Sequence, residues 1–223
     1  MTIKGAIFDM DGTLADSLFF WEYFWRSVGE KYFGDKDFKP APEIDNAART
    51  MIYKEAMDIF NERYKVEEKN EDFFAFAESG IDTFYRTQVK EKAGATAFLK
   101  YLKSNGVRMV LASATASHHI KTVMGVLGFD EYFDGVLSCA DIGAGKDKPD
   151  IYLAAIEALG LPLGDIAVFE DSCVALETAA AIGLHTVGIY DEHNFGHDRL
   201  ERAAEIYLGR GESLETLIEK VSV

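Results

Sequence analysis

Two hydrophobic patterns divide the chain. From about residue 92 to the end, short apolar runs alternate with longer segments whose apolar residues recur at helical spacing. This alternation predicts βαβ units and therefore a parallel sheet covered by helices. The expected strands are 107–112, 135–137, 166–169 and 186–189, with a short one at 205–208. The expected helices are 95–104, 115–127, 150–159, 172–182 and a last one from residue 213.

Residues 17–91 carry the second pattern, which is helical throughout. Trp21, Phe24, Trp25 and Val28 lie at i, i+3, i+4 and i+7, and this spacing places them on one face of a helix. A packed helical core explains this face, and a hydrophobic lid over a substrate is the alternative. The predicted helical tracts are 18–33 after an N-cap at Asp16-Ser17, 44–64 and 70–89, with a loop at 35–42.

The first expected strand ends in two carboxylates. Residues 6–8 form a short apolar run that suits a strand covered on both faces, and Asp9 and Asp11 follow it. Ligands bind beyond the carboxyl ends of parallel strands, and Gly12 lets the backbone turn there. Two ionised carboxylates about 4 Å apart repel each other by about 4 kcal/mol at an effective dielectric near 20. We therefore expect a cation, and hard oxygen ligands favour Mg²⁺.

The same stretch carries a family signature. Asp9-Met10-Asp11-Gly12-Thr13 resembles the Asp-x-Asp-Gly-Thr motif of the haloacid dehalogenase superfamily, in its phosphatase and phosphomutase branch. In that family the first aspartate is a nucleophile and the second a general acid and base, so the resemblance implies these roles for Asp9 and Asp11. Without the resemblance, an ordinary polar turn would explain these residues.

Ser113 is the candidate for the family's second motif. It follows the expected strand 107–112, and its hydroxyl lies with neighbouring backbone N–H groups, including that of Ala114, near a helix start. Such groups hold phosphate oxygens without adding charge, although a simple helix cap is the alternative. In the resembled family, the phosphate-binding Ser or Thr stands at this position.

Lys146 is the candidate for the third motif. A nucleotide-binding loop is excluded, because that pattern requires Ser or Thr after Gly-Lys and Asp147 stands there. A fixed ammonium group offsets carboxylate repulsion and takes charge from a transferring phosphoryl group. Family sequences typically read Gly-Lys-Pro-x-Pro-Asp, which aligns Lys146 with the motif lysine. Because Asp147 replaces the first proline, Lys148 stays as an alternative.

Glu170 and Asp171 form the second acidic pair. They follow the apolar strand 166–169, just as Asp9 and Asp11 follow the first strand. The resemblance implies that Asp171 binds Mg²⁺ directly, together with Asp9 and Asp11. We expect Glu170 to act on the metal mainly through water.

The resemblance covers residues 1–14 and 93–223 and implies an α/β fold. Its Rossmann-like parallel-sheet core is expected at residues 1–16 and 92–223, with an inserted all-helical cap at residues 17–91. Arg49 in the cap is a candidate for holding a substrate phosphate, although the ordinary role of such an arginine is an ion pair on its own helix.

The implied reaction is the Mg²⁺-dependent hydrolysis of a small phosphorylated metabolite, a phosphosugar being one candidate. Asp9 would form an aspartyl-phosphate, Asp11 would protonate the leaving oxygen and then deprotonate water, and Ser113 and Lys146 would stabilise charge. A β-phosphoglucomutase-type reaction is the alternative. Those mutases carry a histidine on the first cap helix and a lysine after the second motif, where this chain has Trp21 and Ala116.

Three remoter alternatives are disfavoured. The family's dehalogenases lack the second acid that Asp11 supplies. A non-enzymatic phospho-aspartate receiver would be about half this length, would carry its acidic pair before the phosphorylated strand, and would have no helical insert. A catalytically silent binding module would have little reason to keep all five polar groups of the motifs.

The composition of the chain limits the kinds of partner that we expect it to bind. With 23 Lys and Arg against 38 Asp and Glu, the net charge of −15 argues against nucleic acid or an anionic membrane as partner. No long apolar span or signal-peptide pattern stands in the sequence, so we expect a cytoplasmic protein, and a monomer. Cys139 and Cys173 are too few for a disulfide framework and are expected to be reduced, buried thiols. The five histidines show no zinc-ligand spacing, and we expect structural or exposed roles for them.

Overall fold

A parallel sheet forms the centre of the molecule. The computed structural model describes residues 1–51, 53–66 and 70–223. The strand order is β5-β4-β1-β6-β7-β8, and every neighbouring pair is parallel. The strands are β1 (Gly5–Phe8), β4 (Arg108–Ser113), β5 (Gly135–Ser138), β6 (Ile166–Glu170), β7 (His185–Ile189) and β8 (Ile206–Leu208). The predicted Rossmann-like α/β fold is confirmed.

The first strand lies in the middle of the sheet. Ile7 is in register with Val110 of β4 on one side and with Val168 of β6 on the other. All four residues of β1 are buried, which explains why the sequence has no polar position there. The strands β4 and β6 pair with opposite edges of β1, so the strand order changes direction at β1. Such a topological switch point leaves a crevice at the carboxyl ends of the strands.

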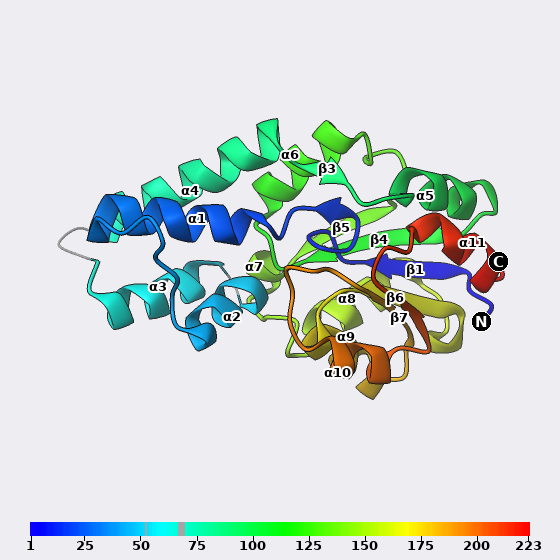
Figure 1. Cartoon of the computed structure of the whole chain (residues 1–223). Helices are drawn as coiled ribbons and strands as arrows, with labels where there is room; N and C mark the ends of the chain where they lie inside the picture. Colours follow the sequence, from blue (N-terminus) through cyan, green and yellow to red (C-terminus); the bar gives the residue numbers. More distant parts are fainter. Residues whose placement is uncertain (52, 67–69) are drawn as a thin grey trace.

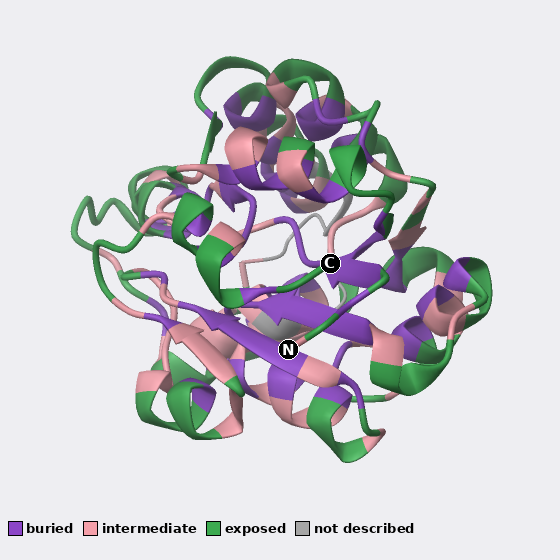
Figure 2. Cartoon of the chain, turned by 90° about the vertical axis from the view of Figure 1, so that its right-hand side faces the viewer, coloured by how far each residue is buried: buried purple, intermediate pink, exposed green. Residues whose placement is uncertain are grey.

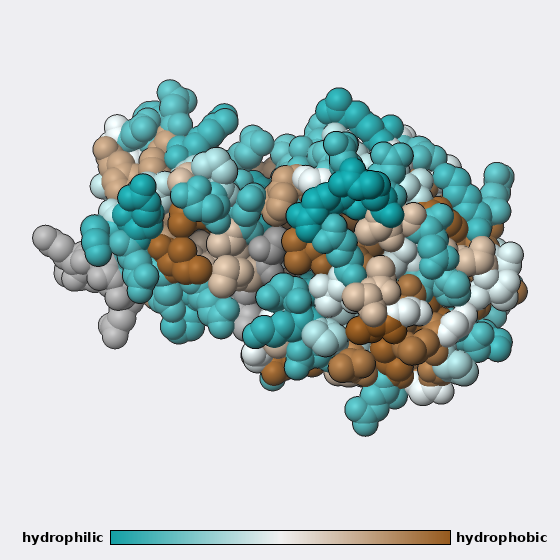
Figure 3. All heavy atoms as spheres, turned by 90° about the horizontal axis from the view of Figure 1, so that it is seen from below, coloured by the Kyte–Doolittle hydropathy of each residue, from teal (hydrophilic) through white to brown (hydrophobic). Residues whose placement is uncertain are grey.

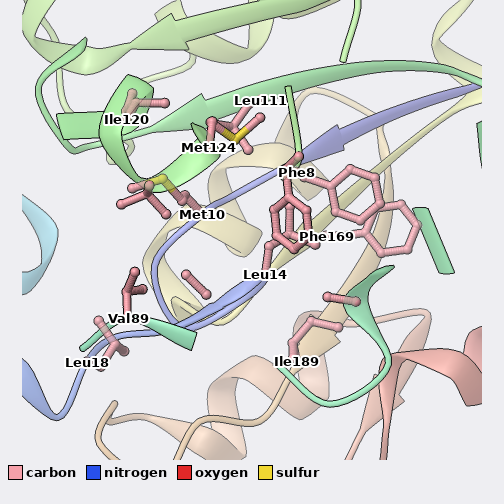
Figure 4. Packing of buried hydrophobic residues seen from close by; sticks show 14 of the residues in the cluster. Phe8, Met10, Leu14, Leu18, Val89, Leu111, Ile120, Met124, Phe169 and Ile189 are labelled. Atoms are coloured by element: carbon pink, nitrogen blue, oxygen red, sulfur yellow. The ribbon is translucent and has the colours of Figure 1, made fainter. Parts of the chain in front are cut away.

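Helices cover both faces of the sheet. On one face Phe8 stacks on Phe169 (Figure 4), with ring centroids 4.3 Å apart. Both rings also contact the ring of Phe98. On the other face Ile7 belongs to a second buried cluster with Tyr152. Figure 2 shows the buried strands between helices whose outer sides are exposed. These helices are α5 (Ala95–Ser104), α6 (Ser117–Leu127), α7 (Cys139–Ile142), α8 (Asp150–Leu159), α9 (Cys173–Ala181), α10 (His197–Ala203) and α11 (Leu217–Lys220).

A set of helices is inserted between β1 and α5 and lies beyond the carboxyl end of β1 (Figure 1). The two connections run through β2 (Ala15–Asp16) and β3 (Lys90–Glu91), which pair antiparallel. We call helices α1 to α4 the helical insert. Their bounds are α1 (Phe20–Val28), α2 (Pro42–Thr50), α3 (Tyr53–Tyr64) and α4 (Asn70–Thr87), with a π-helical turn at Gly29–Phe33.

Aromatic side chains form the interior of the helical insert. Trp25 stacks on Phe60 with ring centroids 5.0 Å apart, and Phe60 stacks on Phe73 at 5.4 Å. On the face predicted for the first helix, Trp25 therefore lies in a packed core. This cluster is continuous with the one that contains Phe8, so one hydrophobic core joins insert and sheet. The division into two domains stays a prediction.

Three local predictions were wrong. Residues 16 and 17 do not cap a helix: Asp16 lies in β2, and the Ser17 hydroxyl donates to Asp11 while α1 begins at Phe20. The tract 44–64 is two helices, because the backbone of Met51 is extended and ends α2; residue 52 lies outside the described residues. The short helices α7 and α10 were absent from the prediction, because their few turns leave little periodicity in the sequence.

The surface is that of an ordinary globular protein. Polar side chains cover much of the face in Figure 3, and apolar residues occupy separate patches there. Both cysteines are buried free thiols, as predicted. Within the described ranges, none of the helices combines the length and apolar character needed to cross a membrane.

Candidate active site

The carboxyl ends of the central strands and the helical insert enclose one cavity. Asp9 follows β1, Ser113 ends β4 and Glu170 ends β6, and all of them line it. Parallel strands present their carboxyl ends at the same edge of a sheet, which is why residues separated by more than 150 positions meet here. From the insert, α1, α2 and α4 contribute Trp21, Arg49 and Tyr85.

Lys146 joins two of the acids. Its ammonium group donates to a carboxylate oxygen of Asp9 and, at 2.7 Å, to Glu170 Oε2. Burial opposes the charge on Lys146, but the carboxylates of Asp9 and Glu170 outweigh it and raise the pKa of Lys146 well above its ordinary value. Lys148 is exposed and does not line the cavity. Of the two candidate lysines, the structure brings only Lys146 to the acids.

Asp11 is held by three hydroxyl groups. Ser17 and Tyr85 donate to Oδ1 at 2.7 and 2.9 Å, and Thr115 donates to Oδ2 at 2.7 Å. Burial and then the neighbouring charge of Asp9 raise the pKa of Asp11, while these three hydrogen bonds oppose the shift. A carboxyl group with a raised pKa holds its proton closer to neutrality, which is what a general acid needs.

Asp9, Glu170 and Asp171 form a buried carboxylate cluster. One oxygen from each lies within 4.8 Å of the others. Burial and then the charge of Asp9 raise the pKa of Asp171, and the same causes raise the pKa of Glu170 to about 7. Thr13 donates to Asp171 at 3.2 Å and Asn194 at 2.6 Å, and both donors are neutral.

The donor set fits Mg²⁺. When ionised, the three carboxylates and the ammonium of Lys146 leave two negative charges, 3 − 1 = 2, which a divalent cation balances. Oxygen donors of this kind are the ligands that Mg²⁺ prefers. The carboxylate of Asp11 is not part of this cluster, because its oxygens face Ser17, Tyr85 and Thr115. Its predicted place among the metal ligands stays a prediction.

Ser113 ends β4 and lines the cavity. Its hydroxyl accepts a hydrogen bond from the Thr115 amide at 3.1 Å, and Ala114 to Ala116 also line the cavity. The main chain of these residues leads into α6, whose first residue is Ser117. Free N–H groups ahead of a helix, with a hydroxyl beside them, are suited to hold phosphate oxygens.

Arg49 reaches the cavity with its guanidinium group already engaged. Nε and Nη2 donate to the Asp45 carboxylate at 3.0 and 3.2 Å, and Nη1 donates to the carbonyl of His193 at 2.7 Å. Arg49 thus lines the cavity, where a phosphate-binding residue would lie, and it also forms the ion pair on its own helix that was the alternative. Its role toward phosphate stays a prediction.

Several residues of the site could not have been found from the sequence. Tyr85, Thr115 and Asn194 contact the predicted acids directly. Glu78 and His119 line the cavity beside them. None of the five stands in a motif, and three come from a helical insert or loop whose position over the strands only the fold defines.

Comparison with known proteins identifies the family. The model of haloacid dehalogenase-like hydrolases matches residues 3–183, so the chain belongs to this family and is a hydrolase. The predicted family and enzyme class are confirmed.

Named relatives include phosphatases. The phosphorylated carbohydrates phosphatase of Thermotoga maritima is 28% identical over 221 residues, which are 97% of this chain and 99% of that one. The fructose-1-phosphate phosphatase YqaB of Escherichia coli is 24% identical and covers 83% of this chain and 95% of its own. The crystal structure of CbbY from Rhodobacter sphaeroides in complex with phosphate superposes with a TM-score of 0.79 at 20% identity, over 96% of both chains, which shows the same fold.

Proposed function

We propose that the protein is a Mg²⁺-dependent phosphatase that hydrolyses a small phosphorylated metabolite through an aspartyl-phosphate on Asp9. One observation carries the proposal: two carboxylates on one turn have different surroundings. Asp9 lies in a carboxylate cluster against an ammonium group, whereas Asp11 has a raised pKa and three hydroxyl partners. Environments that separate two acids in this way assign one as nucleophile and the other as acid.

Asp9 attacks the phosphorus of the ester. A bond forms between a carboxylate oxygen and phosphorus, and the bond between phosphorus and the alcohol oxygen breaks. Lys146 holds the Asp9 carboxylate in place and carries positive charge next to the transferring group. A Mg²⁺ ion held by Asp9 and Asp171 would supply further electrostatic stabilisation of the phosphoryl oxygens. Ser113 and the backbone N–H groups after it bind the same oxygens.

Asp11 moves the proton in both halves of the reaction. In its protonated form it gives the proton to the leaving alcohol oxygen. As a carboxylate it then takes a proton from the water that attacks the aspartyl-phosphate, and free Asp9 and inorganic phosphate result. The helices over the cavity limit access of other water while the ester is bound.

Phosphosugars are the first substrates to examine. Relatives named for phosphorylated carbohydrates and fructose 1-phosphate support this choice. Hydrolysis is favoured over mutase chemistry, because Trp21 and Ala116 both line the cavity where a mutase carries a histidine and a lysine. Indole has one donor, no acceptor and no proton that titrates near neutrality, so it cannot replace the histidine.

A phosphate-release screen tests the proposal. The protein is assayed with about a hundred phosphorylated metabolites in Mg²⁺ and again with a chelator. We expect release that the chelator stops and that Asp9→Asn abolishes, because an amide cannot replace the nucleophile. Asp37→Asn, in an exposed loop, is the matched control and should keep the full rate. Chelator-resistant turnover, or an active Asp9→Asn variant, would overturn the mechanism.

A further inference from the structure

One face of α4 runs from the proposed acid toward the outer end of the cavity. Glu78, Ile81 and Tyr85 are spaced by three and four residues, so they share that face, and all three line the cavity. The Tyr85 hydroxyl donates to Asp11 Oδ1 at 2.9 Å. A leaving group that extended from Asp11 along this face would reach Glu78.

His119 of α6 adds a second polar group on this path. Its ring centroid lies 5.6 Å from that of Tyr85, and the side chain is buried and lines the cavity. His119 Nε2 lies 2.9 Å from Glu78 Oε1, whereas Nδ1 has no hydrogen-bond partner in the described structure. A buried polar group of this kind calls for a ligand or water.

The protonation state of His119 determines which hydrogen bonds its ring can donate and accept. Burial lowers the pKa of His119, and this outweighs the opposing charge of Glu78. A neutral imidazole presents one donor and one acceptor, and a carboxylate presents acceptors only. A pair of adjacent hydroxyl groups matches this arrangement, because one can donate to Glu78 while the other exchanges hydrogen bonds with His119.

The cavity offers no uncommitted cation for a second anionic group. Among its described lining residues, the lysine and arginine side chains are Lys146 and Arg49. Lys146 is paired with Asp9 and Glu170, and Arg49 with Asp45 and two backbone carbonyls. The outer part of the cavity instead carries the acid Glu78, which repels a second phosphate or a carboxylate.

We propose that Glu78 and His119 form a subsite for a neutral, hydroxyl-bearing leaving group, so that the substrate carries one phosphate and no second anionic group. This inference rests on the proposed phosphatase function and narrows its substrate class to monophosphates of polyols and sugars. It separates this enzyme from family members that act on bisphosphates or on phosphorylated acids.

Two matched substrate pairs test the subsite. The first compares 2-hydroxyethyl phosphate with phosphoglycolate, which have nearly the same size but end in a hydroxyl and a carboxylate. The second compares fructose 1-phosphate with fructose 1,6-bisphosphate. We expect kcat/KM to favour the neutral member of each pair by about tenfold or more, since like charges a few ångströms apart supply a discrimination of that order.

Two variants locate the effect. Glu78→Gln removes the negative charge and keeps the shape, so the preference for 2-hydroxyethyl phosphate over phosphoglycolate should fall about fivefold. Glu62→Gln is the matched control: Glu62 is an exposed acid of α3 that does not line the cavity, and the preference of this variant should equal that of the unchanged protein.

The outcomes separate the two proposals. Equal or better hydrolysis of phosphoglycolate and the bisphosphate, or an unchanged preference in Glu78→Gln, overturns the subsite and leaves the phosphatase function standing. Release from none of these four esters and from none of the metabolites in the phosphate-release screen overturns the phosphatase function. In that case calorimetry of 2-hydroxyethyl phosphate and phosphoglycolate with the unchanged protein decides the subsite, and tighter binding of phosphoglycolate refutes it.

Discussion

Asp11 is contacted by hydroxyl groups from three different parts of the chain. Ser17 comes from the first connection to the insert, Tyr85 from the end of α4 and Thr115 from the turn after β4. Three donated hydrogen bonds stabilise the carboxylate, while burial and Asp9 favour the protonated form. This balance suits the proton transfer that we propose for Asp11.

Replacement of Asp11 by asparagine should therefore impair both half-reactions. We expect kcat to fall by at least the ~100-fold that is typical of general acid and base catalysis, and the fall to be largest for esters with poor leaving groups. The measurement compares an alkyl phosphate with 4-nitrophenyl phosphate, whose leaving group needs no proton. A loss of less than tenfold on the alkyl ester would mean that Asp11 has another role.

The buried imidazole of His119 makes stability depend on pH. The folded-state pKa of His119 is lowered from its ordinary value of 6.5. As the pH falls below 6.5, the unfolded chain therefore binds the proton before the folded chain does. The contribution of His119 to the unfolding free energy should therefore fall as the pH drops from 7.5 to 5.5, by at most about 1.4 kcal/mol per pH unit for one proton. Burial outweighs Glu78 and Asp82, which act in the other direction, while His118 acts in the same direction as burial.

Urea unfolding of the wild type and of His119→Gln at several pH values isolates this contribution. The difference between the two unfolding free energies should change with pH in the direction given, because the other titrating groups are common to both proteins. Parallel pH curves would show that the proton uptake of His119 is the same in the folded and unfolded chains.

At the residue scale, motif residues were predictable and their partners were not. Asp9, Ser113 and Asp171 each end or follow a recognisable apolar strand, Lys146 stands in a motif before the helix 150–159, and the fold brings all four to one cavity. Asn194, in contrast, comes from an irregular loop, where neither periodicity nor a motif indicates which way a side chain points. Local sequence predicts strand ends, but contacts across the cavity depend on the whole chain.

The loop after β7 connects elements that are otherwise far apart. The carbonyl of His193 in this loop accepts a hydrogen bond from Arg49 of α2. Asp191 of the loop forms an ion pair at 2.6 Å with Lys92, which follows β3. Asn194 of the same loop donates to Asp171 at 2.6 Å. The position of the helical insert is thereby linked to a carboxylate of the cluster.

Replacement of Asn194 by alanine should weaken this link at the carboxylate. Loss of the hydrogen bond frees Asp171 to rotate, and removal of such a supporting partner typically lowers metal affinity by about 10- to 100-fold. The measurement is the Mg²⁺ concentration that gives half of the maximal rise in Tm. Glu192→Gln, an exposed neighbour in the same loop, should keep the wild-type value, and an unchanged value in Asn194→Ala would contradict the link.

The elements themselves were largely predictable where they are long. The helices α5 and α8 begin and end at the predicted residues, because strong periodicity and a following Gly or Asn mark them. The break at Met51 was missed, since the apolar period runs through it without Pro or Gly. The pair β2 and β3 was missed because two-residue strands have no pattern of their own.

For the whole molecule, the carboxylate cluster implies a folded state that a cation stabilises. Buried carboxylates with raised pKa values repel each other, and the unfolded chain holds no such site. A ligand that binds only the folded chain adds about 2.7 kcal/mol of stability at a hundred times its Kd. We expect Tm to rise with Mg²⁺ in thermal unfolding, and to rise much less for Asp171→Asn. An equal rise in both proteins would place the ion elsewhere.

The paired strands β2 and β3 have a consequence for how such an enzyme can change over evolutionary time. Ala15 lies opposite Glu91, so the polypeptide departs toward the helices and returns from them at neighbouring points. A segment whose ends are adjacent can be lengthened, shortened or exchanged without moving the strands at its base. The turn that carries Asp9 and its ammonium partner Lys146 could thus be inherited unchanged while the helical insert diverges. New specificities would then arise by exchange of the helical insert rather than by changes at the strand ends.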